Sequence, residues 1–158
     1  MAKPKHPSNQ HLPDFGWYCS YIEDLEEVAA VCQWCCYTDI RYVHTMEHPD
    51  TSEVRYTGCI CAGLMERNPE AARRREAVLK SRTTRRDKWL QRNWIDTHKG
   101  MRLKSNGYMI TVFPRAGAYS FSIRKEDNVY FSKVRYANSF AAKLAAFDCL
   151  NPKKITGA

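Results

Sequence analysis

Long apolar runs are missing from this 158-residue chain, and its first residues contain no apolar stretch of the kind that directs secretion. The first absence predicts that no helix spans a membrane. The second predicts a cytoplasmic protein. A glycine-rich phosphate-binding loop and internal repeats are also lacking. We expect no membrane partner, because long apolar runs are missing, and no small-molecule substrate.

The seven cysteines are an odd number, which does not fit a complete disulfide framework. Because thiols stay reduced inside cells, metal binding is the better use for four of them. Cys32 and Cys35 form a Cys-x-x-Cys pair, two strand-like runs joined by a polar turn follow, and Cys59 and Cys61 form a Cys-x-Cys pair. Tetrahedral zinc is bound by four such ligands. The sequence therefore predicts one structural Zn²⁺ ion, bound by Cys32, Cys35, Cys59 and Cys61.

Other residues compete for a place in this ligand set. His44 and His48 would lie on one face of a strand that starts near residue 40, and either is an alternative to one cysteine. Cys36, directly after the first pair, is another alternative. Cys19 and Cys149 are better explained as small core residues than as ligands.

A cysteine knuckle, a hairpin and ligands at the start of a helix resemble the treble-clef class of zinc finger. The resemblance covers about residues 30–80 and implies a bound Zn²⁺ ion. It departs from the class at one point, because the usual second pair is Cys-x-x-Cys and here Cys59 and Cys61 are separated by one residue.

Glu47-His48-Pro49 resembles the histidine-bearing strand of HNH nucleases, which also use a treble-clef shape. Their chemistry needs a general-base histidine and further ligands from the following helix. After Cys61 that helix offers Asn68 but no histidine before His98. We therefore predict that the protein is not an enzyme.

Charge is distributed unevenly along the chain. Residues 1–71 contain five lysines and arginines against eleven acidic residues, a net charge of −6. Residues 72–104 contain twelve against three, or +9, and residues 105–158 contain eight against three, or +5. This asymmetry predicts a polyanionic partner for the basic part. The alternative is a solvated basic helix.

The basic residues between 73 and 104 recur at helical spacing, which would place several on one side of a helix. Trp89 and Trp94 lie among them, either stacking on bases or, as we favour, anchoring the helix in a core. The candidate nucleic-acid-binding residues are Arg73, Arg74, Arg75, Arg82, Arg85, Arg86, Lys88 and Arg92, together with Arg115 and Arg124 from the last third.

The last third changes from helical to alternating patterns. Strands are predicted over residues 108–113, 118–124 and 129–134, followed by a helix capped by Ser139. Earlier, Asn68-Pro69 indicates a kink or the start of a second helix. The fold class is α+β, with a flexible arm (1–14), a zinc-finger domain (15–80), a basic helical linker (81–104), a β-β-β-α domain (105–151) and a tail (152–158).

This β-β-β-α order, with G-A-Y-S-F-S-I on its second strand and A-A-F-D on its helix, resembles the plant ethylene-response-factor type of DNA-binding domain. The resemblance implies a three-stranded sheet in the DNA major groove, contacted through Arg115, Arg124 and Arg135. With residues 85–98 counted as a helix, the order is also similar to the double-stranded-RNA-binding domain, but the lysine-rich start of that family's last helix is absent.

These observations predict a small zinc-stabilised nucleic-acid-binding protein with an accessory or regulatory role, whose partner is DNA or RNA. The alternative is a protein–protein interaction module or inhibitor that docks on an acidic partner surface. Compact basic proteins with cysteine-bound zinc are common among phage and mobile-element accessory proteins.

Overall fold

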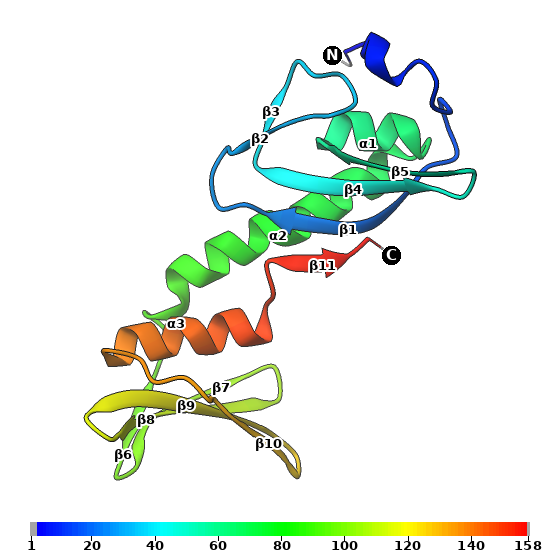
Figure 1. Cartoon of the computed structure of the whole chain (residues 1–158). Coiled ribbons are helices and arrows are strands. Elements are labelled where there is room, and N and C mark those ends of the chain that lie inside the picture. The colour runs from blue at the N-terminus through cyan, green and yellow to red at the C-terminus, as the bar shows by residue number, and fades with distance from the viewer. Residues whose placement is uncertain (1–2, 158) are drawn as a thin grey trace. The chain divides into compact units, whose positions relative to one another are not determined.

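The computed structural model describes residues 3–157, which form two compact units. Unit 1 contains the chain up to Ser81 together with the segment from Lys153 onward, and unit 2 is Arg82–Pro152. Each unit contains an antiparallel sheet and helical segments, so the α+β class is confirmed (Figure 1). In the described part of the chain no helix is both long and apolar enough to cross a membrane.

Unit 1 is built on a four-stranded antiparallel sheet with the order β11-β1-β4-β5, and a two-stranded sheet pairs β2 with β3. Its strands are β1 (Tyr18–Asp24), β2 (Ala30–Val31), β3 (Asp39–Ile40), β4 (Tyr42–His48), β5 (Thr51–Thr57) and β11 (Lys154–Thr156). Its helical segments are η1 (Pro7–Asn9), α1 (Cys59–Met65) and the first part of α2 (Pro69–Trp89).

The helix α1 and the start of α2 pack closely against each other in unit 1. The side chain of Asn68 accepts a hydrogen bond from the backbone N–H of Ala71 at 3.1 Å, which caps the start of α2. Pro69, the first residue of α2, has no N–H to leave unpaired there. A Cβ on Gly63 would lie 2.8 Å from the Cα of Pro69, so glycine allows α1 and the start of α2 to approach closely.

The N-terminal segment, assigned above to a flexible arm, lies against the turn that carries the first cysteine pair. The side-chain amide of Asn9 donates hydrogen bonds to the backbone carbonyls of Gln33 (2.8 Å) and Trp34 (2.9 Å). Asn9 and Leu12 are both buried. The N-terminal segment therefore packs against the turn that contains Cys32 and Cys35 and stabilises it.

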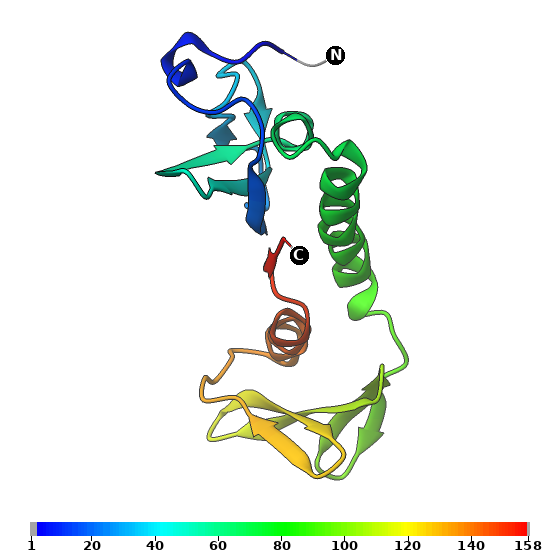
Figure 2. The same cartoon turned by 90° about the vertical axis from the view of Figure 1, so that its right-hand side faces the viewer.

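Unit 2 contains a five-stranded antiparallel sheet with the order β10-β9-β8-β7-β6, and α3 lies along one face of it (Figure 2). The core between them includes Trp89, Ile110 and Phe147. The elements are β6 (Ile95–Thr97), β7 (Gly100–Ser105), β8 (Tyr108–Arg115), β9 (Ala118–Lys125), β10 (Asn128–Phe131) and α3 (Ser139–Leu150). Asn138, not Ser139, caps α3 by accepting from the backbone N–H of Ala141.

The predicted three-stranded sheet is therefore wrong, because β6 and β7 extend it to five strands. Residues 81–104 were expected to form a basic helical linker, but the helix ends at Trp89. Beyond that point Leu103 faces the core opposite Ile110, while Arg102 and Lys104 face outward. Gly100 (φ +144°) leaves no room for a side chain, since a Cβ there would lie 2.1 Å from the Val112 carbonyl oxygen. The charges of this segment follow strand alternation rather than helical spacing.

Candidate functional site

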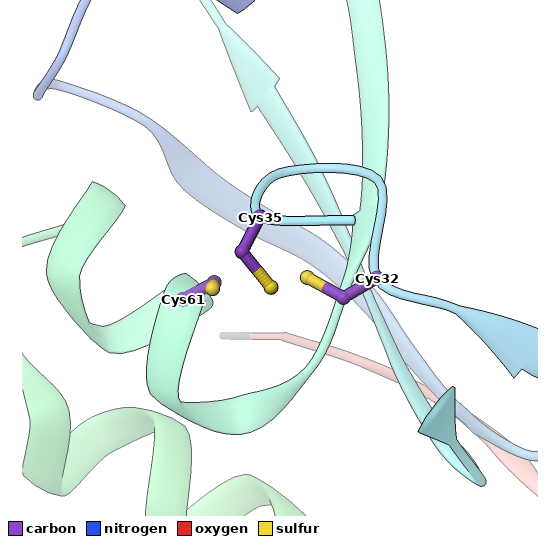
Figure 3. Close-up of side chains that lie close together, drawn as sticks. All are labelled: Cys32, Cys35 and Cys61. Atoms are coloured by element: carbon purple, nitrogen blue, oxygen red, sulfur yellow. The ribbon is translucent and has the colours of Figure 1, made fainter. Parts of the chain in front are cut away.

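Three buried cysteines of unit 1 are positioned as a possible metal site. Cys32 and Cys35 lie in the turn between β2 and β3, and Cys61 lies in the first turn of α1. Their sulfur atoms converge (Figure 3), and each lies within 4.8 Å of the other two. Cys36 adopts a left-handed conformation (φ +61°), and its N–H donates to the carbonyl of Cys32 at 2.8 Å, which closes the turn.

Two of these thiols have pKa values shifted in opposite directions by their mutual contact. The pKa of Cys32 is lowered to about 5, chiefly because the Cys61 thiol donates a hydrogen bond to it, with backbone N–H groups adding to the effect. The pKa of Cys61 is raised by that same interaction and by burial. Soft sulfur ligands of this kind suit Zn²⁺, which binds them as thiolates. The three thiols are therefore ligands of a possible metal site.

Cys59, the remaining member of the predicted ligand set, lies in a different group. Its sulfur is within 4.8 Å of ligand atoms of His44 and Glu76, which come from β4 and α2. Burial and the neighbouring carboxylate of Glu76 raise the pKa of Cys59 to about 12. The structure thus brings together three of the four predicted cysteines and places the fourth beside an imidazole and a carboxylate.

Glu76 was missed by the sequence analysis. It lies 17 positions after Cys59, and no ligand motif links the two. One signal was present, because Glu76 is the single acidic residue between Glu70 and Asp87 in an otherwise basic segment.

His48 has a structural role. The ring is buried, Nε2 donates to the backbone carbonyl of Phe15 at 2.9 Å, and Nδ1 accepts from the N–H of Asp50 at 3.0 Å. Both ring nitrogens are thus used within the fold. His48 accordingly belongs to neither of the two groups of possible metal ligands found among the described residues.

The other three cysteines belong to neither group, and all seven are free thiols. Cys19 is buried in the core of unit 1, as expected. Cys149 is exposed on α3, so its assignment to the core is wrong. Cys36 is exposed beside the knuckle.

Several arginines of α2 are held in ion pairs rather than presented to solvent. Arg82 is 3% exposed, and its guanidinium lies 2.6 Å from a carboxylate oxygen of Asp148. Arg86 lies 2.8 Å from the same oxygen, and Arg75 pairs with Glu66 in unit 1. These three side chains stabilise their units. Arg73, Arg74, Arg85, Lys88 and Arg92 are exposed.

The tryptophans that follow serve as anchors, as favoured above. Trp89 is 3% exposed, its indole N–H donates to the carbonyl of Lys143 at 2.7 Å, and its ring packs on Phe147. Trp94 is half-buried and donates to the carbonyl of Trp89 at 3.2 Å. Trp89 thus lies within the core of unit 2 and Trp94 packs against it.

The face of the unit 2 sheet opposite α3 carries a groove of about 600 Å³. Register places Arg102 opposite Thr111 and Arg124 opposite Met109 on this face. In the described structure no acidic residue lines the groove. We call this surface the open face and define it by Lys99, Arg102, Phe113, Arg124, Val129 and Phe131.

Of the three arginines implied by the ethylene-response-factor resemblance, Arg124 lines the open face. Arg115 is exposed at the end of β8 and donates to the carbonyl of Ser132 at 3.4 Å. Arg135 is exposed outside the strands. Lys99 and Arg102 were not among the predicted binding residues. The alternation of residues 101–104 was the signal that could have found Arg102.

The chain matches no protein-family model, no curated protein and no solved structure. None of the four family resemblances given above therefore gains support from relatives.

Proposed function

We propose that the protein binds single-stranded nucleic acid through the open face of unit 2, and that unit 1 is stabilised by a Zn²⁺ ion at the three converging thiols. The observation that carries the proposal is a groove with cationic side chains, exposed aromatic and aliphatic side chains and no acidic lining residue. Such a surface is complementary to a phosphate backbone with accessible bases.

The cations of the open face are available for phosphates. Neither Arg102 nor Arg124 forms an ion pair with any carboxylate among residues 3–157. Both are exposed, and Lys99 lies at the same groove. This distinguishes them from Arg82 and Arg86. We propose the interface on the sheet rather than on α2, because only on the sheet do exposed cations line a groove beside Val129 and Phe131.

The apolar part of the open face favours unpaired bases over an intact duplex. Phe131 is 60% exposed and Val129 is 40% exposed on β10, with the half-buried ring of Phe113 nearby in the groove. Single-stranded nucleic acids stack their bases on such rings, whereas bases within a duplex are already stacked on one another. Because both nitrogens of His48 are occupied, we propose a binding protein rather than a nuclease.

The proposal is tested by removing two cations from the open face. The double variant Arg102→Gln, Arg124→Gln should bind a labelled single-stranded oligonucleotide more weakly than the parent in fluorescence anisotropy. Because each lost phosphate contact lowers the log–log salt slope by about 0.7 for single strands, the slope should fall by about 1.4. The matched control Arg73→Gln, Arg74→Gln removes the same charge from exposed positions of α2 and should bind as the parent does.

Equal weakening by both double variants would show a non-specific effect of net charge and would contradict an interface on the open face. Failure of the parent to bind any oligonucleotide at low salt would favour the alternative, an acidic protein partner. Tighter binding to duplex than to single strands would favour the major-groove mode and would contradict the single-stranded assignment.

A further inference from the structure

A second group of metal-ligating side chains lies in unit 1 beside the three thiols. It consists of His44 on β4, Cys59 at the start of α1 and Glu76 on α2, and one ligand atom of each lies within 4.8 Å of the other two. Three separate elements deliver these side chains to one point. The group differs in chemistry from the three thiols, because it combines imidazole, thiol and carboxylate.

His44 supplies an independent reason to expect a ligand at this point. The residue is completely buried, and neither ring nitrogen has a hydrogen-bond partner among the described residues. Oε2 of Glu76 lies 3.9 Å from Nε2, which is beyond hydrogen-bond distance. Buried polar groups are almost always paired. A coordinated cation would satisfy a ring nitrogen that the protein leaves unpaired.

The neighbouring charges leave Glu76 suited to this role. Lys80 lies one helical turn further along α2, and its Nζ is 3.4 Å from Oε1 of Glu76. This pair is at the surface, since the Lys80 side chain is 60% exposed, and it occupies one carboxylate oxygen. The other oxygen, Oε2, is the one that faces His44. The carboxylate can therefore serve Lys80 and a cation at the same time.

We propose that His44, Cys59 and Glu76 bind a second divalent transition-metal ion, of the Zn²⁺ class, separate from the ion proposed at the three thiols. Imidazole, thiolate and carboxylate are the ligand types that bind Zn²⁺. Three protein ligands leave the fourth tetrahedral position for water. A cavity of about 450 Å³ is lined by Cys59, Glu76 and the three thiols, which gives ions a route to both groups.

The test is a count of bound ions by native mass spectrometry after titration of the metal-free chain with Zn²⁺. The parent should bind two ions, and Glu76→Gln should bind one. His44→Gln should also bind one, and circular dichroism shows whether this core variant remains folded. The matched control Glu70→Gln removes an exposed carboxylate of the same helix and should keep two ions. Glu76 is partly exposed, so Glu76→Gln is less disruptive than His44→Gln. If His44→Gln does not fold, the ion count of Glu76→Gln decides the test.

Two results would overturn the proposal. The first is a Glu76→Gln variant that binds as many ions as the parent. The second is a parent that binds a single ion, which Cys59→Ser releases and Glu76→Gln retains, because Cys59 would then complete the thiol site. Nucleic-acid binding plays no part in either readout, so the open face and the second metal site can fail separately.

Discussion

Cys59 and Cys61 are two positions apart at the start of α1, yet their sulfurs belong to different groups. Cys61 joins the thiols of the β2–β3 turn, whereas Cys59 joins His44 and Glu76. Successive residues of an α-helix are rotated by about 100°, so a separation of two turns the side chains about 200° apart. Helix geometry therefore divides this Cys-x-Cys pair between two groups of possible ligands.

Loss of one converging thiol should remove the ion proposed at the three thiols. We expect Cys35→Ser to lose this ion and to unfold unit 1, which would also release the second ion proposed in that unit. Structural zinc contributes roughly 10–16 kcal/mol in small fingers, which is comparable to the whole stability of a domain, about 5–15 kcal/mol. Elemental analysis and circular dichroism measure the two effects. Cys149→Ala changes an exposed thiol of unit 2 and should leave the metal content unchanged; equal metal in Cys35→Ser and parent would disprove the site.

Asp148 should make the stability of unit 2 depend on pH. Burial opposes its ionisation, but hydrogen bonds and charge from Arg86 and Arg82 outweigh burial and lower its pKa. Its contribution is therefore fully present above the unfolded pKa of about 3.9 and is lost as the pH falls through the lower folded pKa. Its side chain is 34% exposed, so solvent screens the interaction, and we expect Asp148→Asn to cost about 1 kcal/mol at pH 7.

Chemical denaturation at pH 7 and at pH 3 measures this dependence. The difference in free energy of unfolding between the parent and Asp148→Asn should shrink at the lower pH. Asp127→Asn changes an exposed residue between β9 and β10 and should match the parent within about 0.5 kcal/mol at pH 7. A difference for Asp148→Asn that stays constant between the two pH values would show that its charge is not the cause.

Phe131 should contribute to binding by stacking rather than by charge. Phe131→Ser is expected to weaken the binding of a single-stranded oligonucleotide by about 1–3 kcal/mol, the value of one stacked base, while the salt slope stays as in the parent. The matched control is Phe140→Ser on α3, because Phe140 is 59% exposed and Phe131 is 60% exposed. If both serine variants bind equally well, the ring of Phe131 does not contact the bases.

The sequence alone determined features that depend on short-range spacing. The alternation of residues 108–124 predicted β8 and β9, the Cys-x-x-Cys pair predicted the turn that brings Cys32 and Cys35 together, and Asn68-Pro69 marked the start of α2. Each of these follows from neighbouring residues, because backbone periodicity and helix caps act over a few positions.

Only the tertiary structure decided which distant groups meet. Arg82 and Asp148 are 66 positions apart in sequence. Arg82 was predicted to bind nucleic acid, but it is buried and forms an ion pair with Asp148. Glu76 reaches Cys59 because α1 and α2 pack closely at Gly63. The basic residues after Trp89 alternate along a strand, which moved the proposed interface from a helix to a sheet. Spacing along the chain defines local geometry, whereas the pairing of charges and ligands depends on how separate elements pack.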